Sequence, residues 1–336
     1  MIVWWLLGVV FIVACGLTLL LRRYALAKSL MDIPNERSSH SVPTPRGGGV
    51  AIVVACSLAL PVLWGGGYLE GESLLGVLGG GLLIAMIGFA DDHGHIDAKW
   101  RLLGHFIAAG WTLYWLNGFA PIQLFGESVD LSVIGGVLAA LYLVWMLNLY
   151  NFMDGIDGLA SAEAISACLG MCLVYWWFGT INLIWEPLIL IGAVAGFFCW
   201  NFPPARIFMG DAGSGFLGFI LGAFALESAW VRPEYFWCWI ILLGVFIVDA
   251  TLTLIRRLIR GEKVYQAHRS HAYQHASRRY QSHLLVSSIV VLINLVWLLP
   301  IALFVGAGWL SGELGCLIAF IPLAVLGWKF EAGVAS

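Results

Sequence analysis

The sequence predicts an all-α integral membrane protein, a single domain over residues 1–336 with about eleven membrane-spanning helices. Of its 336 residues, 61% are hydrophobic and only 11% are charged, and the mean hydropathy is +0.90, a composition unlike that of soluble domains. Apolar stretches of roughly 20 residues, enough to cross the hydrocarbon as a helix, recur about every 25 to 30 residues from end to end. This spacing leaves no room for a separate soluble domain.

The predicted spans are apolar runs separated by polar, glycine-rich or proline-rich segments. The first run has no basic residues before it and is longer than the apolar part of a signal peptide, so we expect it to remain as a span. In chain order, the predicted spans lie near residues 2–21, 48–64, 73–90, 102–117, 131–150, 159–178, 184–200, 214–230, 236–255, 284–305 and 313–330.

The basic residues are distributed unevenly between the two faces of the membrane. If the spans alternate in direction, all of the 17 Lys and Arg residues except Arg232 fall on one face. Short loops rich in Lys and Arg tend to stay in the cytoplasm. The pattern therefore predicts an N-terminus outside the cytoplasm, a C-terminus inside it, and a cytoplasmic face that also carries the unusual acidic residues.

The first cytoplasmic segment, residues 32–49, is rich in turn-forming residues and contains three prolines and the run Gly47 to Gly49. Arg37, His40 and Arg46 offer cationic or hydrogen-bonding groups, and the glycines would let backbone N–H groups approach an anion. An ordinary connecting loop that obeys the charge rule explains the segment equally well.

The second segment places Asp91 and Asp92 side by side at the end of the third span, followed by Lys99. Adjacent like charges at the membrane surface are costly unless a cation or hydrogen-bond donors offset them. Helix capping would explain only one of the two, and a helix C-terminus disfavours an anion. The pair therefore indicates a functional site.

The third and fourth segments supply oxygen ligands. Asn148, Asn151, Asp154 and Asp157 recur every three residues after the fifth span, and such oxygens suit a hard cation such as Mg²⁺. Asp211 precedes the eighth span between glycines, where it could cap the helix or help to bind a phosphate or a metal–phosphate pair. The two interpretations of Asp211 are compatible.

The fifth segment, residues 256–283, is strongly basic. His268, His271 and His275 would share one face of a helix. Zinc binding, a basic patch facing lipid, and contact with a phosphate or sugar nucleotide are three interpretations, of which the last is favoured. Asp249, near the end of the ninth span, is expected to pair with Arg256.

Three of these motifs occur in the same order as the cytoplasmic-loop motifs of a known enzyme family. They are Asp91-Asp92 with the downstream Lys99, the run from Asn151 to Ala160, and the run from Phe208 to Ser214. Over nearly the whole chain the sequence thus resembles the polyprenyl-phosphate N-acetylhexosamine-1-phosphate transferase family (glycosyltransferase family 4, with WecA-like and MraY-like enzymes). The resemblance implies a polytopic enzyme of the bacterial inner membrane that transfers a sugar 1-phosphate from a UDP-sugar to undecaprenyl phosphate, releases UMP and requires Mg²⁺, with Mn²⁺ as an alternative ion.

The resemblance also implies roles for individual residues. It assigns the metal to Asp211 and Asn151, and catalytic or phosphate-orienting roles to Asp91 and Asp92, with Asp157 as a further catalytic candidate. The remaining candidates are expected to bind or position the substrates: Arg46, Lys99, Asp154, His268, Arg269 and His271. The expected partners are undecaprenyl phosphate, a UDP-N-acetylhexosamine and membrane lipids, not nucleic acid, and a homodimer is left open.

One departure from the family pattern bears on the donor. The muramoyl-pentapeptide branch carries adjacent histidines in its last cytoplasmic loop, whereas this chain has His268-Arg269-Ser270-His271. Together with Arg46-Gly-Gly-Gly, this is more similar to the branch that initiates O-antigen synthesis for lipopolysaccharide. The donor could be a UDP-linked GlcNAc or a 6-deoxy sugar such as FucNAc or QuiNAc.

Two other classes of protein compete with this interpretation. An ion-coupled transporter also uses carboxylates in the membrane, but it usually places them near the midplane between repeated halves. Here the acids lie at the cytoplasmic ends of the spans, and no repeat is evident. A non-catalytic scaffold for glycan assembly would tolerate loss of the acids, yet every motif is present.

Overall fold

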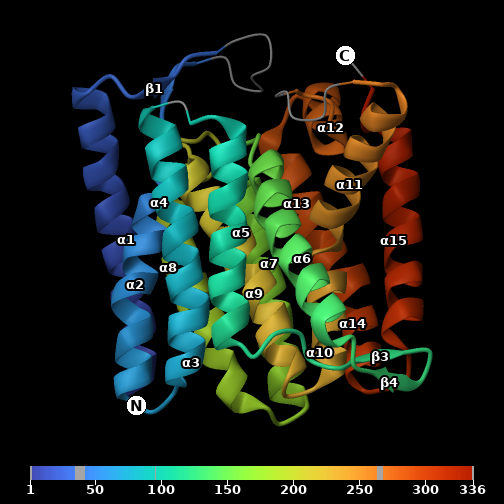
Figure 1. The fold of residues 1–336 in the computed structure, drawn as a ribbon. Helices are drawn as coiled ribbons and strands as arrows, with labels where there is room; N and C mark the ends of the chain where they lie inside the picture. The colour runs from blue at the N-terminus through green and yellow to red at the C-terminus, as the bar shows by residue number, and fades with distance from the viewer. Residues whose placement is uncertain (1, 35–41, 95, 263–267, 335–336) are drawn as a thin grey trace.

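The computed structural model describes residues 2–34, 42–94, 96–262 and 268–334. It is a bundle of upright helices joined by short connections (Figure 1). The longer α-helices of the first half are α1 (Ile2–Ala27), α2 (Val50–Gly65), α4 (Gly79–His93), α5 (Ala98–Trp115), α6 (Ser132–Met153) and α7 (Leu159–Trp177). Those of the second half are α8 (Trp185–Asn201), α9 (Asp211–Ala229), α10 (Pro233–Leu242), α11 (Gly244–Ile259), α12 (Ala272–Tyr280), α13 (His283–Ile293), α14 (Leu299–Gly306) and α15 (Gly312–Lys329).

Short elements complete the fold. α3 (Gly71–Ser73) and a π-helical turn (Leu74–Leu78) run into α4, a 3-10 turn (Ile181–Ile184) runs into α8, and a second π-helical turn (Asn294–Leu298) joins α13 to α14. The strands β1 (Met31–Asp32) and β2 (Thr44–Pro45) pair antiparallel, with Met31 opposite Pro45. At the opposite end of the bundle, β3 (Ile122–Leu124) and β4 (Glu127–Val129) form a hairpin (Figure 1).

The structure confirms the all-α polytopic class. Each of the eleven predicted spans falls on helix. Within the described residues, eight helices are long and apolar enough to cross a membrane, and nine if α10 and α11, bent by 69°, count as one broken span. The remaining two predicted spans correspond to α2, which is short, and to α5, which begins with charged residues. The number of eleven crossings therefore stays a prediction.

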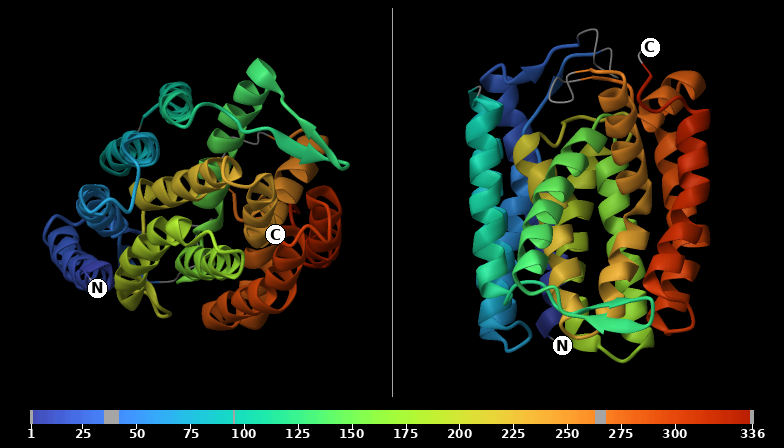
Figure 2. Two further views of the ribbon diagram at one scale, coloured as in Figure 1. Left: turned by 90° about the horizontal axis from the view of Figure 1, so that it is seen from below. Right: turned by 45° about the vertical axis from the view of Figure 1, so that its right-hand side comes forward.

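Helix α9 lies at the centre of the bundle, where nearly all of its residues are buried (Figure 2). Small residues allow its neighbours to approach closely. A Cβ at Gly218 would lie 2.5 Å from the Cβ of Tyr150 on α6, and one at Gly80 on α4 would lie 2.7 Å from the Phe219 ring. Near the end of α4, a Cβ at Gly88 would lie 2.6 Å from the backbone of Asp211 and Ala212, so the start of α9 packs directly against this helix.

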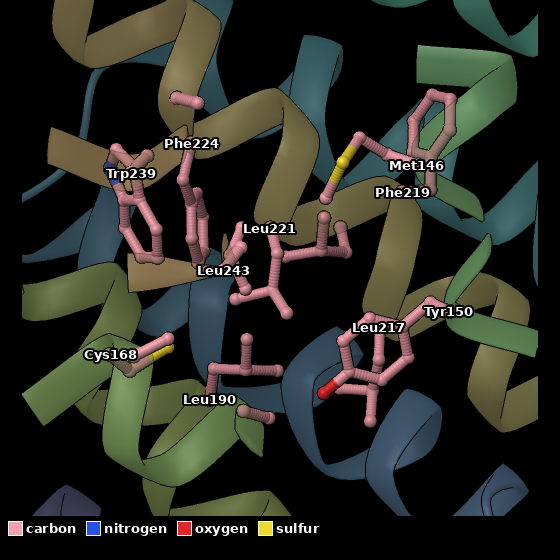
Figure 3. Packing of buried hydrophobic residues seen from close by; sticks show 14 of the residues in the cluster. Met146, Tyr150, Cys168, Leu190, Leu217, Phe219, Leu221, Phe224, Trp239 and Leu243 are labelled. Atoms are coloured by element: carbon pink, nitrogen blue, oxygen red, sulfur yellow. The ribbon is translucent and has the colours of Figure 1, made fainter. Parts of the chain in front are cut away.

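Large apolar side chains fill the space around α9 (Figure 3). Phe224 packs against Trp239 of α10 with ring centroids 5.9 Å apart, and the Trp239 indole N–H donates to the Tyr175 hydroxyl at 2.8 Å. Burial of such rings contributes about 1.5–3 kcal/mol each in water, whereas in lipid close packing replaces the hydrophobic effect as the stabilising term. This packing makes α9 a rigid support for the residues at its N-terminus.

The segments that carry the motifs lie at one end of the bundle. β1, α12 and the C-terminus are found there, while the N-terminus, α3 and the β3–β4 hairpin lie at the other end (Figure 1). The motif-bearing segments are thus gathered at one end of the bundle, and the cytoplasmic location of that end stays a prediction.

Candidate active site

Asp92, at the end of α4, meets the beginning of α9. Its Oδ1 and Oδ2 accept the backbone N–H groups of Asp211 and Ala212, each at 3.3 Å. The first N–H groups of a helix have no acceptor within the helix, and a helix N-terminus favours negative charge. Asp92 therefore caps α9 from a neighbouring helix. Gly210, with φ 79°, makes room for this contact, because a Cβ there would lie 2.8 Å from Asp92 Oδ2.

This arrangement separates the two interpretations of Asp211. Gly210 is the N-cap residue of α9, and Asp211, the first helical residue, makes no side-chain cap. The capping role of Asp211 is therefore wrong, because the helix begins one residue earlier than that role requires. The N–H groups that an N-cap at 211 would accept, those of Gly213 and Ser214, donate to the Gly210 carbonyl at 3.1 Å. The Asp211 carboxylate instead faces Asn151 and Asp91 within hydrogen-bonding reach.

Arg101 of α5 is the cation nearest to these carboxylates. It forms an ion pair with Asp91, and its Nη1 lies 3.9 Å from Asp211 Oδ2. Lys99, the expected substrate ligand, has a side chain that is 73% exposed and lies 3.9 Å from Asp97. Lys99 and Arg101 are two residues apart on α5, which corresponds to about 200° of rotation around the helix, so their side chains point in nearly opposite directions. The structure brings Arg101 to the acidic residues and leaves Lys99 outside.

Asp154 follows the last residue of α6 and adds a further carboxylate to the group. Its N–H donates to the Asn151 carbonyl at 3.2 Å, and none of the described residues donates a hydrogen bond to its carboxylate. Burial, followed by the charges of Asp211, Asp157 and Asp92, raises the pKa of Asp154 well above its usual value. Asp154 is therefore a buried carboxyl group that lies near three other carboxylates.

Asp157 has a different environment. Its Oδ2 accepts the Ala205 N–H at 3.0 Å and lies 3.2 Å from His283 Nδ1, and the following Gly158 N–H donates to Asn201 Oδ1 at 3.0 Å. These contacts join the segment after α6 to the 202–210 segment and to α13. Asp157 lies in a network that holds these segments together.

Two of the three glycines of the first loop favour the interpretation as a connecting loop over that as an anion site. The Gly48 and Gly49 N–H groups donate to the carbonyls of Phe208 and Met209 at 2.9 and 2.8 Å, so these two are not available to an anion. A Cβ at Gly49 would lie 2.5 Å from the Cα of Gly213, so the glycines serve close packing. Arg46 donates to the Asp92 carbonyl at 2.6 Å and so reaches the acidic group. Arg37 and His40 lie outside the described residues.

The histidine segment is only partly helical, because α12 begins at Ala272. His271 is 2% exposed, and its Nδ1 lies 3.4 Å from Asp249 Oδ1. Asp249 also accepts the N–H groups of Ala272 and Tyr273 at 2.9 and 3.0 Å. The expected pairing of Asp249 with Arg256 is therefore wrong.

The other basic side chains of this segment are arranged around α12. Arg256 donates to the Ala332 carbonyl instead of pairing with Asp249. His268 stacks on His271 with ring centroids 4.8 Å apart. Burial, followed by the charges of His271 and Arg257, lowers the pKa of His268 to about 3. Burial and then the charge of Arg269 lower the pKa of Arg278, so these two cations lie close together.

Two cavities adjoin the acidic residues. The first, of about 640 Å³, has Asp91, Arg101, Asn151 and Asp211 in its lining. The rest of its wall is largely apolar and reaches Leu141 of α6, ten residues and so about 15 Å along the helix from Asn151. This shape suits an amphiphile with one charged end.

The second cavity, of about 670 Å³, has a more polar wall. It is lined by Asp157, Phe208, Arg278 and His283, with hydroxyl and amide groups of α12 and the turn after it. An aromatic ring beside cationic and hydrogen-bonding groups suits a polar, charged molecule that contains a planar ring.

The donor set between these cavities fits a hard divalent cation. Carboxylates and a carboxamide are the ligands that Mg²⁺ uses. Burial, and then the neighbouring carboxylates, raise the pKa of Asp154, and a bound cation would offset both effects. Within the described part of the chain, no three His, Cys, Asp or Glu side chains are already close enough to surround an ion. The fit to Mg²⁺ is therefore one of chemistry, through Asp211, Asn151 and Asp154.

Comparison with known proteins identifies the family. The family model described as Glycosyl transferase family 4 matches residues 74–229. Decaprenyl-phosphate N-acetylglucosaminephosphotransferase of Mycolicibacterium smegmatis is 31% identical over 73% of this chain and 70% of its own length. The chain belongs to glycosyl transferase family 4.

Further relatives in this family agree with that membership. The probable undecaprenyl-phosphate N-acetylglucosaminyl 1-phosphate transferase of Bacillus subtilis is 28% identical over 88% of this chain and 83% of its own length. Phospho-N-acetylmuramoyl-pentapeptide-transferase of Streptococcus pyogenes serotype M18 is 30% identical over 67% of this chain and 69% of its own length. The predicted family resemblance is confirmed, and so is the prediction of a multi-pass membrane protein.

Sequence reasoning missed several residues that the structure brings to the site. Arg101 was counted only as a basic loop residue, although its spacing of ten from Asp91 places it on the next helix. His283 and Arg278 follow the His268–His271 motif in the chain, and no local sequence pattern links them to Asp157 or Phe208. Only the folding of α12 and α13 against the 202–210 segment does so.

Proposed function

We propose that the protein transfers an N-acetylhexosamine 1-phosphate from a UDP-sugar to undecaprenyl phosphate and releases UMP. The reaction takes place at the cytoplasmic face of the bacterial inner membrane. Membership of the family supports a phosphosugar transferase, and the names of the relatives describe the transfer of an N-acetylglucosamine phosphate to undecaprenyl or decaprenyl phosphate. The basic residue distribution supports the orientation.

One observation carries the proposal. Asp91, Asp92, Asp154 and Asp211 converge at the N-terminus of α9, with Arg101 as the cation within 4 Å of two of them. An apolar cavity extends from this group along the membrane-spanning helices, and a polar cavity lies on the side of Asp157 and Phe208. A lipid phosphate and a nucleotide sugar need such a pair of sites.

We assign the lipid acceptor to the apolar cavity and the nucleotide sugar to the polar one. The isoprenoid chain lies along α5 and α6, and Arg101 binds the terminal phosphate in place of Lys99. Arg269 and Arg278 form charge-assisted hydrogen bonds with the diphosphate of the donor. His268 is neutral at pH 7, so it acts as a single hydrogen-bond donor, and the buried His271 acts mainly by fixing α12.

Asp211, Asn151 and Asp154 are the residues that would hold Mg²⁺. The bound ion would neutralise the diphosphate and the charge on departing UMP. Asp92 positions α9 and Arg46, and Asp91 orients Arg101. Asp157 keeps the segments around the polar cavity in place.

The chemistry that remains for the chain is mostly positioning and electrostatics. An oxygen of the lipid phosphate attacks the phosphorus that carries the sugar, and the bond from that phosphorus to the UMP oxygen breaks. A phosphomonoester has its second pKa near 6, so the acceptor is already largely dianionic at neutral pH. A strong general base is therefore not required of Asp91 or Asp92.

The donor sugar and the glycan that the product feeds are also part of the proposal. The sequence His268-Arg269-Ser270-His271 favours the branch of the family that initiates O-antigen or a related envelope glycan. The donor is a UDP-linked GlcNAc, FucNAc, QuiNAc or a similar HexNAc.

The experiment supplies membranes containing the protein with undecaprenyl phosphate, Mg²⁺ and a panel of UDP-HexNAc donors. We expect release of UMP together with a lipid-linked sugar diphosphate for at least one donor. Membranes carrying the Asp211→Asn variant serve as the matched control and should release little UMP. Release of UDP in place of UMP would exclude phosphosugar transfer.

A further inference from the structure

A second apolar opening lies on the other side of α11 from the acidic group. It is a crevice of about 310 Å³ between α11, α12, α13 and α15, which we call the α15 crevice. Val245 and Val248 of α11 line it, whereas Leu254 of the same helix lines the apolar cavity of the candidate active site. Helix α11 thus separates the two openings.

The α15 crevice has a buried apolar floor and an exposed apolar rim. Val286, Val290 and Leu323 form part of the floor and are each less than 8% exposed, whereas Ile289 and Leu326 on the rim are each 40% exposed. Its walls include α15 and α13, and α13 together with the following π-helical turn and α14 forms one candidate membrane span, His283–Gly306. In a bilayer the exposed rim of the crevice therefore faces the hydrocarbon region.

The end of the crevice is basic. Lys329, the last residue of α15, lines it, is exposed, and makes no hydrogen bond or ion pair with any described residue. Arg256 and Arg260 lie at the same end, where they donate to the carbonyls of Ala332 and Gly333. The carboxylate in the lining, Asp249, is turned toward the N-terminus of α12 and is occupied there.

We propose that the α15 crevice binds an anionic membrane phospholipid, with an acyl chain on the floor of valine and leucine and the phosphate at Lys329. Basic pockets between membrane-spanning helices on the cytoplasmic side are suited to anionic headgroups. The occupant is a phospholipid and not the polyprenyl acceptor, because α11 separates this crevice from the acidic group and the crevice has about half the volume of the apolar cavity.

Occupancy bears on the candidate active site through α12. Tyr273 and Ala276 form part of the wall of the crevice, and the Tyr273 hydroxyl donates to the Phe152 carbonyl at 3.0 Å, two residues before Asp154. A lipid in the crevice therefore packs against α12 and stabilises its contact with the end of α6.

The test uses the full chain in nanodiscs of phosphatidylcholine that contain a small fraction of phosphatidylglycerol with a photoreactive acyl chain. Peptide mass spectrometry then locates the crosslinks. We expect crosslinks to α13 and α15 at crevice residues, and competition by unlabelled phosphatidylglycerol but not by added phosphatidylcholine. Val290→Phe fills the floor and should abolish these crosslinks, whereas Leu292→Phe, at a position 58% exposed on the same helix, should leave them unchanged.

Lys329→Gln provides a second variant whose exposed position does not threaten folding. Loss of one lysine near a headgroup should raise the concentration of phosphatidylglycerol needed for half-maximal competition about fivefold. Equal competition by both phospholipids, an unchanged result for Lys329→Gln, or crosslinks that persist in Val290→Phe at the level of Leu292→Phe would each overturn the proposal. So would displacement of the probe by polyprenyl phosphate alone.

Discussion

The backbone N–H of Asp211 donates to Asp92 Oδ1 at 3.3 Å, so the two aspartates are direct neighbours. Replacement of each by asparagine should nevertheless have opposite effects on stability and turnover. In Asp92→Asn a single oxygen remains for two backbone N–H groups of α9, so one of them loses its acceptor. An unsatisfied buried donor costs about 1–3 kcal/mol. We therefore expect the unfolding midpoint of Asp92→Asn to fall by roughly 2–4 °C for each kcal/mol of unfolding free energy that is lost.

Asp211→Asn should spare stability and abolish turnover. The N–H groups of α9 keep their Asp92 acceptors, so the cost is limited to about 0.3–1 kcal/mol for a negative charge lost at a helix N-terminus. Reduced repulsion from Asp92, and then from Asp91, offsets part of this cost. The loss of turnover follows from the lost attraction between the Asp211 carboxylate and the metal ion. Two unit charges 4 Å apart attract each other by about 4 kcal/mol at an effective dielectric constant near 20, and a loss of that size in the transition state lowers the rate roughly a thousandfold.

The assay compares both variants with the wild type in the same detergent. Thermal unfolding gives the stability, and UMP release over a range of Mg²⁺ concentrations gives turnover and ion dependence. Asp211→Asn should unfold within about 2 °C of the wild type, lose turnover by orders of magnitude and require more Mg²⁺. Near-normal turnover with an unchanged Mg²⁺ requirement would remove Asp211 from the metal site, and a stability loss equal to that of Asp92→Asn would refute the capping argument.

The remaining predictions concern charge, protonation and sidedness. Arg101→Gln should raise the KM for the lipid acceptor at least about tenfold, whereas Lys99→Gln should change it less than twofold; similar effects for both would contradict the geometry. The pKa of His268 falls on folding from 6.5 to about 3, so the unfolded chain binds more protons between these values and stability should decline as pH falls through this window. His268→Gln should flatten that decline in a chemical-denaturation series, and an unchanged slope would show that the histidine is not buried neutral. Single cysteines should react with an impermeant reagent from one face only, in the cytoplasm at positions 97 and 208 and outside at positions 68 and 127.

The sequence was sufficient to predict the elements whose cause is local. Each predicted span is a helix because apolar runs of this length satisfy their backbone groups internally in lipid. The acidic motifs could also be found, since charges at span ends are rare without a function. Helix α12 and the breaks in the spans at 243 and 294–298 were not predicted, because packing against neighbours decides them.

The roles within the site depended on contacts between distant segments. Nothing near Asp92 in the sequence indicates that it caps a helix beginning 119 residues later. Likewise, the sequence left open whether the first-loop glycines approach an anion or only connect two spans, and the structure uses the close approach of Gly49 for Met209 and Gly213. Arg101 and Lys99 are distinguishable only once the rotation of α5 is known.

The most direct measurement follows the phosphorus atom that carries the sugar. A UDP-HexNAc donor labelled with ³²P at that phosphorus is incubated with the purified protein, undecaprenyl phosphate and Mg²⁺, and the label is traced in the lipid and aqueous phases. The proposed reaction moves the ³²P into the lipid fraction and releases unlabelled UMP in equal amount. Label that remains in the aqueous nucleotide, with only the sugar on the lipid, would contradict phosphosugar transfer at this site.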